Sequence, residues 1–336
     1  FIDNEENVEE NFEKLVNLIN DQNIKTDESE FRLFIRFIEN ISSEHHRTKH
    51  FFIKIEKILL LFREEFGKYL TIEETFNIFK YNKRMLLFLL QNEFVKMNFE
   101  LSYFFTNYKH FYPEYFCKEI KEFFPSFADL YCDSKFEQNR LNGENDISYC
   151  QIIRNDSISE FIQYINSNHL PLDTTISASV FETNSFLLFL EPSLIEYSAF
   201  FGSIKIFKYL TENKAKMTPK LWLYSIHGRN IEILKILKEY QIKPQDITYK
   251  QCLEEAIRCH HYEIIEFIQN EFKINDFDKS KNISYYNFIS FPEDLLDNRN
   301  NFFYFCKYDY AFFVKQFLKH KNIDINFKLG DIIEGT

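Results

Sequence analysis

One sequence pattern recurs at intervals of about thirty residues in the second half of this 336-residue chain, and it restricts the fold more than any other feature. Each copy has small or medium side chains, then a polar or glycine-bearing break, then a second apolar stripe at helical spacing. The four copies are YSAFFGSIKIFKYL (197–210), YSIHGRNIEILKIL (224–237), EAIRCHHYEIIEFI (255–268) and FCKYDYAFFVKQFL (305–318). This pattern predicts pairs of helices that stack in series, so that each pair contacts mainly its neighbours.

The polar breaks within the copies fall at Gly202, Arg229, His260 and Asp309, which are 27, 31 and 49 residues apart. The long last interval indicates an insertion, KSKNISYYNFISFPED at 279–294. Its four aromatic residues make a solvated loop unfavourable, because each ring can bury about 150–250 Å². We therefore expect the insertion to pack on the solenoid as an extra helix or to be covered by a partner.

Residues 1–125 carry helical patterns that do not follow the thirty-residue repeat. In RTKHFFIKIEKILLLFREEF at 47–66, the Phe, Ile and Leu residues have helical spacing and the charged residues lie on the other side. The chain has only 6 Gly and 7 Pro, so few residues interrupt its helices. Residues 126–146 lose the apolar stripe and indicate a domain boundary. We predict an all-α fold with a helical N-terminal domain at 1–146 and about four to five repeats at 147–336.

The repeat resembles the ankyrin repeat. HYEII at 261–265 and NIEIL at 230–234 resemble the H-x-E-I-V stretch of that family, and NIDIN at 322–326 resembles its G-A-D-V-N end. RNDSISEFIQYI at 154–165 and NKRMLLFLL at 82–90 are similar to a large protist family of uncharacterised ankyrin proteins with a helical N-terminal region. The resemblance implies a divergent ankyrin-type helical solenoid after an N-terminal helical domain, and it implies no known activity.

Two groups of histidines raise the question of a metal site. Cys259, His260 and His261 are adjacent, but three successive side chains on a helix point in different directions and cannot converge on one ion. This tripeptide falls where the repeat has its turn between helices. The second group lies in SSEHHRTKH at 42–50, which we interpret as a loop before a helix that begins near Arg47. The sequence therefore predicts no metal site.

Composition excludes several classes of function. The net charge of −11 argues against nucleic acid as the main partner, because binding phosphates needs a basic surface. With so few glycines, a phosphate-binding loop or a dinucleotide-binding fold is excluded, and no catalytic motif such as HExxH or GxSxG is present. The six cysteines form no CxxC pair, which favours free thiols in the cytoplasm. No apolar run is long enough to span a membrane, and we predict neither catalytic residues nor a cofactor.

Two functional hypotheses follow. The first is a non-enzymatic scaffold for protein–protein interaction, because repeat arrays expose an extended binding surface. The alternative is a structural component of a stable cytoskeletal or other polymeric assembly, which would associate a cytoplasmic chain with the cytoskeleton. The candidate contact residues are those at expected outward positions of the repeats, Glu196, Leu223, Glu254 and Phe303, and those of the insertion, Tyr285, Tyr286 and Phe288.

Overall fold

Every regular element of the structure is a helix. The computed structural model describes residues 2–3, 6–48, 50–109, 111–127, 134–188, 190–274, 277–278, 280–287, 299–308 and 310–320. Across these ranges, the one extended pairing is an isolated bridge between Thr175 and Ser193. The predicted all-α class is confirmed for this part of the chain.

Contacts group the chain into two compact units. The large unit holds residues 41–274, and the small unit holds residues 1–40 together with 275–336. This division differs from the predicted one at 146/147, although the apolar stripe does weaken there. The reason is that side chains before the predicted boundary bond to groups after it: Lys83 Nζ donates to Val180 O at 2.8 Å, and Asn184 Nδ2 donates to Ser43 O at 3.1 Å.

The first part of the large unit is a series of short helices. They are α3 (Phe51–Leu60), α4 (Arg63–Tyr69), α5 (Ile72–Phe79), α6 (Lys83–Gln91), α7 (Phe99–Asn107), α8 (Tyr112–Tyr115), α9 (Cys117–Ile120), the 3-10 helix η1 (Pro125–Phe127) and α10 (Ser134–Asn142). Polar side chains start several of them, because free N–H groups of a first turn need acceptors. Thr71 forms a capping box with Glu74, and Asn82 accepts from Met85 N.

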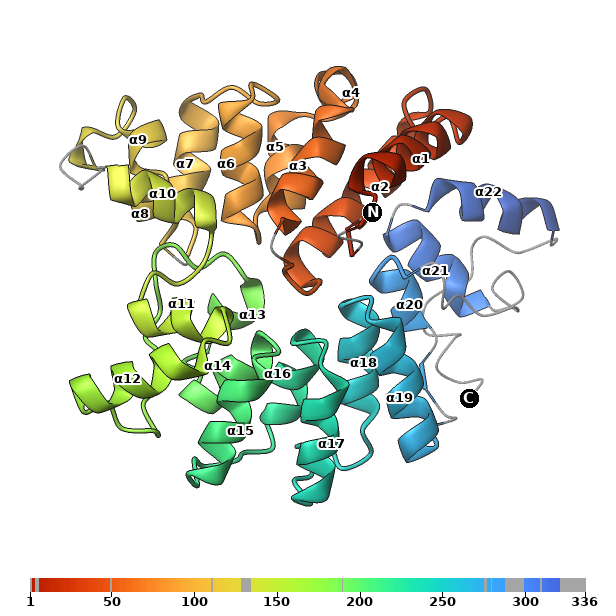
Figure 1. The fold of residues 1–336 in the computed structure, drawn as a ribbon. Coiled ribbons are helices and arrows are strands. Elements are labelled where there is room, and N and C mark those ends of the chain that lie inside the picture. The colour runs from red at the N-terminus through yellow and green to blue at the C-terminus, as the bar shows by residue number, and fades with distance from the viewer. Residues whose placement is uncertain are drawn as a thin grey trace. The chain divides into compact units, whose positions relative to one another are not determined.

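The second part of the large unit is a stack of helix pairs. The helices are α11 (Ser148–Arg154), α12 (Ile158–Asn168), the short α13 (Ser185–Leu188), α14 (Leu194–Phe200), α15 (Ile204–Glu212), α16 (Leu221–His227), α17 (Ile231–Glu239), α18 (Lys250–Arg258) and α19 (Tyr262–Phe272). The first helices α11, α14, α16 and α18 contact one another in turn, and so do the second helices α12, α15 and α17. Figure 1 shows these two layers side by side. From 148 to 272, successive helix pairs therefore contact one another in series.

The turn inside each pair uses one residue in the left-handed backbone conformation. The residues are Asp156, Gly202, Arg229 and His260, with φ between 48° and 67°. Three of these coincide with the breaks predicted from the repeat spacing. Successive pairs also approach closely at Gly228, where an added Cβ would lie 1.9 Å from Ala199 O. The stack therefore requires glycine at this position.

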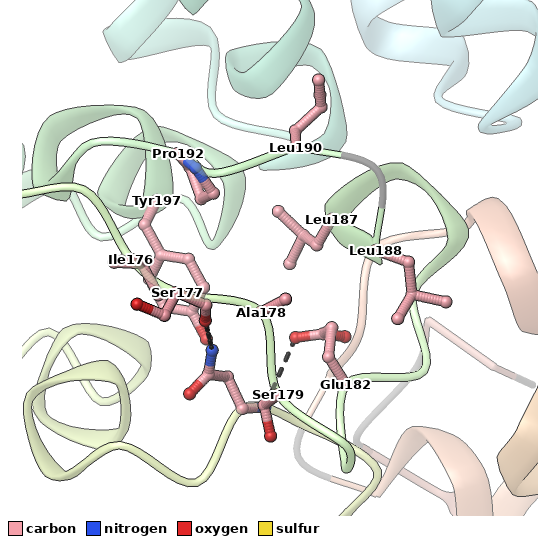
Figure 2. Close-up of a pocket in the computed structure, with 11 residues that line it drawn as sticks. Ile176, Ser177, Ala178, Ser179, Glu182, Leu187, Leu188, Leu190, Pro192 and Tyr197 are labelled. Atoms are coloured by element: carbon pink, nitrogen blue, oxygen red, sulfur yellow. Dashed lines mark hydrogen bonds between the residues drawn. The ribbon is translucent and has the colours of Figure 1, made fainter. Parts of the chain in front are cut away.

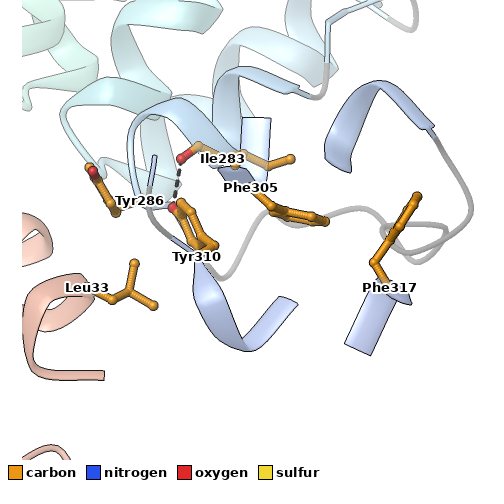
Figure 3. Close-up of a cluster of buried hydrophobic side chains, with 6 residues drawn as sticks. All are labelled: Leu33, Ile283, Tyr286, Phe305, Tyr310 and Phe317. Atoms are coloured by element: carbon orange, nitrogen blue, oxygen red, sulfur yellow. Dashed lines mark hydrogen bonds between the residues drawn. The ribbon is translucent and has the colours of Figure 1, made fainter. Parts of the chain in front are cut away.

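The small unit is built from both ends of the chain. It contains α1 (Val8–Asp21), α2 (Glu28–Glu44) as far as Asn40, α20 (Ser280–Ser284), α21 (Arg299–Lys307) and α22 (Ala311–His320). Its buried core contains Leu33, Ile283, Tyr286, Phe305, Tyr310 and Phe317 (Figure 3). Tyr310 OH donates to Ile283 O at 2.7 Å, and the Tyr286 ring stacks on Tyr310.

The expected insertion is ordered as helix α20 over its first part. Residues 280–287 place Ile283 and Tyr286 in the core of the small unit, which is the extra-helix alternative rather than a solvated loop. Tyr286 has φ 55°, and Asn287 N donates to Asn282 O, as in the turns of the preceding pairs. Residues 288–294 of the insertion lie outside the described residues.

Candidate functional site

The predicted contact residues of the large unit are buried or half-buried, whereas the sequence analysis expected them to face outward. Glu196 is buried, with 6% of its surface exposed. Its carboxylate accepts hydrogen bonds from Ser193 N and Oγ and from Thr218 Oγ1. The prediction that Glu196 faces outward is wrong, because a glutamate three residues after an N-cap serine folds back as a capping box. Leu223 and Glu254 are half-buried.

The predicted contact residues of the small unit divide between core and surface. Tyr286 is buried in the core, with 8% of its surface exposed, so it stabilises the unit from inside. Phe303 and Tyr285 are half-buried. Phe288 lies outside the described residues. Of the seven predicted contact residues, the six that the structure describes are buried or half-buried.

A different surface of the large unit is rich in exposed lysines. Helices α15 and α17 bury Ile, Phe and Leu side chains every three or four residues, so the lysines between them face solvent. Exposed lysines also follow each helix in the connections to α16 and α18. We call this surface the lysine face; its members are Lys205, Lys208, Lys214, Lys216, Lys220, Lys235, Lys238, Lys243 and Lys250.

The segment that carries the lysine face has a net charge opposite in sign to that of the whole chain. Residues 203–250 contain ten basic and four acidic side chains, a net charge of +6, whereas the chain as a whole carries −11. Two ion pairs are present on this face, Lys208 with Glu232 at 2.5 Å and Lys238 with Glu271. The remaining lysines of α15 and α17, Lys205 and Lys235, form no ion pair with a described acidic residue. The net charge of the whole sequence concealed this local excess of positive charge.

Two exposed apolar side chains accompany the lysine face. Tyr240 follows the last turn of α17 with 55% of its surface exposed, and Ile247 lies in the connection to α18 with 72% exposed. Lys243 and Lys250 lie on either side of Ile247 in the sequence. Lysine ammonium groups attract anions but provide no nucleophile or base in their charged form, so the face is suited to binding rather than catalysis.

The two histidine groups of the sequence meet in the interior of the large unit. His45 Nδ1 donates to Cys259 O at 2.8 Å, and its ring lies edge-on to His261, 4.9 Å between centroids. His46 N donates to His261 Nε2 at 3.2 Å, while His46 Nδ1 donates to His227 O. The sequence singled out both groups but gave no signal that residues more than 200 positions apart pack together.

These contacts hold His261 in its neutral form. Its Nδ1 carries a proton because it donates to Ile226 O at 2.9 Å, and its Nε2 accepts from His46 N. Burial, reinforced by the neighbouring His45 and His46, holds the pKa of His261 well below its usual range. His261 therefore acts as a bridge between the backbone of α16 and the segment that follows α2.

Beside this cluster lies a buried row of thiol, imidazole and carboxylate. Cys259 Sγ is 3.5 Å from His227 Nδ1, and His227 Nε2 is 2.6 Å from Glu255 Oε1. Burial raises the pKa of the Cys259 thiol well above its ordinary value, so it is not a thiolate nucleophile. Burial would also raise the pKa of Glu255, but the hydrogen bond and charge of His227, together with Arg258, lower it to about 2. The row is closed to solvent and suited to a structural role.

The side chains of His227, Glu255 and Cys259 are of types that ligate metal ions, and their ligand atoms lie within 4.8 Å of one another. Two features do not fit an ion. A Zn²⁺ about 2.0 Å from both atoms would hold His227 Nε2 and Glu255 Oε1 about 3.3 Å apart, wider than the 2.6 Å observed. Arg258 also bonds Glu255 Oε1, which places a positive charge in the site. We therefore interpret the row as a hydrogen-bonded network.

Lys83 is the other unusual titratable group of the large unit. Its side chain is buried, its Nζ donates to Val180 O at 2.8 Å, and it lies 5.1 Å from the centre of the Tyr115 ring. Burial lowers the pKa of Lys83 to about 7, against smaller opposing effects of Glu182 and Glu114. The amine joins α6 to the irregular segment before α13, and its charge is costly to keep there.

We expect the stability of the fold to rise by about 2 kcal/mol between pH 7 and pH 9 on account of Lys83. In this window the unfolded chain still binds the lysine proton, because its pKa is 10.5, whereas the folded chain loses the proton above about 7. Unfolding in urea, followed by the fluorescence of the single tryptophan, Trp222, measures the change. Lys83→Met should abolish the rise, and Lys96→Met, an exposed lysine, should keep it. An equal rise in both variants would contradict the prediction.

A small pocket lies where the segment before α13 crosses the first repeat helices. Figure 2 shows that it is lined mainly by Leu187, Leu188, Leu190, Pro192 and Ile176, with Glu182 and Tyr197 at its polar side. Its volume is about 10 Å³, which is room for roughly one water molecule. Pockets that bind substrates or cofactors have volumes of about 300–1,000 Å³, so this pocket is not a candidate active site.

Taken as a class, the described part of the chain is all-helical with a repeat-like series of helix pairs, and its large unit has an exposed lysine face and a closed polar interior. Residues 212–293, from the end of α15 to beyond α20, match a family described as a domain of unknown function, DUF3447. No curated protein and no solved structure matches the chain. Among the described helices, none combines the length and apolar character that crossing a bilayer requires.

Proposed function

We propose that this chain is a non-enzymatic scaffold that binds protein partners through divergent ankyrin-type repeats. The observation that supports this most is the series of helix pairs from α11 to α19, in which the first helix of each pair contacts the first helix of the next. Such a stack offers an extended outer surface whose length grows with the number of repeats. A cytoplasmic location agrees with the five described cysteines, none of which forms a disulfide with another described cysteine.

The interior of the large unit favours binding over catalysis. Its conspicuous titratable groups, the histidine cluster and the row formed by Cys259, His227 and Glu255, are buried except for the half-buried His46, and most of them hydrogen-bond within the interior. A catalytic group must reach a substrate, and the buried groups do not reach the surface. The outer faces of the second helices α15 and α17 expose lysine and glutamate side chains.

Affinity capture from the native cell with the full chain as bait, read by mass spectrometry, tests the proposal. We expect a small set of proteins whose recovery requires folded repeats. Gly228→Ala, which disrupts the stack, should lose them, and Gly67→Ala, at an open surface position, should retain them. Equal recovery by both baits, or no recovery by the natural chain, would contradict a scaffold.

The same capture separates the adaptor from the structural alternative. An adaptor should elute from size exclusion as a discrete complex of one copy with its partner. A component of a cytoskeletal or other polymer should instead sediment with that polymer in many copies. Either result is compatible with binding through repeats, and the sedimentation decides which of the two functions is correct.

A further inference from the structure

We infer that the lysine face binds an acidic, amphipathic segment of a partner protein. This inference rests on the proposed scaffold function and names the chemistry of its partner. The lysine face joins two neighbouring second helices, α15 and α17, and the ion pair between Lys208 and Glu232 links one to the other. The lysines of α15 and α17 therefore lie on helices that contact each other.

Charge complementarity identifies the sign of the partner. Residues 203–250 carry +6, and the rest of the chain, with thirty basic and forty-seven acidic side chains, carries −17. Several lysines of the connections, namely Lys214, Lys216, Lys220 and Lys243, are exposed and form no ion pair with a described acidic residue. Their charges remain available to an anionic group that approaches from solvent.

The apolar neighbours indicate that the partner is not a simple polyanion. Tyr240 and Ile247 are among the most exposed apolar side chains described, at 55% and 72%, and they lie before and after Lys243. Exposed apolar side chains near exposed lysines in the sequence can give a binding segment an apolar anchor. A segment with carboxylates on one side and large apolar side chains on the other matches both features.

The distribution of charge favours a short protein segment over nucleic acid. A nucleic acid is a long polyanion, and the chain outside residues 203–250 carries −17, which opposes binding of a long polyanion. A single acidic segment can end where the lysines end. It also supplies the apolar side chains that phosphates lack.

The test uses the full chain and a fluorescent synthetic peptide of about 20 residues, roughly 30 Å of helix, with Glu and Asp on one face and Leu and Phe on the other. Fluorescence anisotropy should show saturable binding that weakens as salt rises, because exposed charges are screened over about 8 Å at physiological ionic strength. A peptide with Gln in place of Glu and Asp should bind at least about tenfold more weakly. A DNA duplex of similar length should bind more weakly than the acidic peptide.

Three substitutions on the face should remove this binding. Together, Lys216→Glu, Lys235→Glu and Lys243→Glu should lower the affinity for the acidic peptide at least about tenfold and leave the melting temperature of the chain unchanged. The matched control reverses three exposed lysines elsewhere in the large unit, Lys96, Lys121 and Lys135, and should change affinity less than about twofold. A second variant, Tyr240→Ser with Ile247→Ser, should weaken binding without altering its salt dependence.

Several results would overturn the inference. They are no saturable binding of the acidic peptide, an equal loss in the control triple variant, or tighter binding of DNA than of the peptide. The capture experiment distinguishes an error in the lysine-face inference from an error in the proposed scaffold function. If the triple variant Lys216→Glu, Lys235→Glu, Lys243→Glu still recovers every partner, the lysine face is not the binding surface and the scaffold remains.

Discussion

Replacing Gly228 with alanine is expected to destabilise the large unit by about 3 kcal/mol or more. An added Cβ would lie 1.9 Å from Ala199 O and 2.9 Å from Gly202 N. Both are backbone atoms of the preceding helix pair, so no side chain can rotate to make room. The only relief is to move two helix pairs apart, which opens the contact between α14 and α16.

The measurement is urea unfolding of the full chain, followed by the fluorescence of Trp222. This tryptophan is buried in α16, its Nε1 donates to Ile242 O, and no other tryptophan is present in the chain. Its signal therefore reports on the repeats rather than on the small unit. We expect the unfolding midpoint to fall well below that of the natural chain.

The matched control is Gly67→Ala. Gly67 lies inside α4 with nothing within 4 Å of its added Cβ, so alanine should stabilise the helix by about 0.5–1 kcal/mol. The two substitutions make the same chemical change with opposite expected signs. If Gly228→Ala stayed within about 0.5 kcal/mol of the natural chain, the close approach of the two helix pairs would be wrong.

The sequence carried enough information for the helix pairs but not for the contact between them. Three of the predicted breaks coincide with left-handed turn residues, Gly202, Arg229 and His260. Repeat spacing finds such positions because the same backbone turn recurs in each pair. Gly228 escaped notice, because its requirement for glycine comes from the neighbouring pair and not from its own turn.

The same limit applies to the functional residues. The histidine groups at 45–46 and 259–261 were each noticed, and each was judged only on its own local geometry. Their mutual packing depends on the path of the chain between them, which periodicity does not encode. The lysine face was missed for a different reason: its lysines are separated by buried residues, so no run of basic residues appears in the sequence.

Burial was missed where a side chain turned back on its own helix. Glu196 has the outward spacing of a repeat ridge, yet it caps α14 through Ser193 and bonds Thr218. The signal was present as Ser193 followed three residues later by Glu196, a capping box. Tyr286, assigned to an insertion, is buried because residues 280–287 form one more helix and turn.

Replacing His261 with alanine is expected to destabilise the large unit by about 3–4 kcal/mol. The imidazole is fully buried, its Nδ1 donates to Ile226 O, and its Nε2 accepts from His46 N. Alanine would leave a cavity and remove one hydrogen bond from each of two backbone groups, Ile226 O and His46 N. His261→Asn can still donate to Ile226 O from its side-chain amide, so it should recover about half of the loss. His50→Ala removes an exposed histidine and should change stability by less than about 0.5 kcal/mol.

The pH dependence of the loss distinguishes a neutral bridging histidine from a residue that only fills space. The folded chain holds the pKa of His261 well below the 6.5 of the unfolded chain, so below pH 6.5 the unfolded chain binds a proton that the folded chain does not. Stability should therefore fall as the pH is lowered from 7 to 5, by up to about 1.4 kcal/mol per pH unit from this group. His261→Asn cannot be protonated and should lack this part of the fall. Urea unfolding at pH 7, 6 and 5 with Trp222 fluorescence measures both chains, and parallel curves would show that His261 does not bridge in its neutral form.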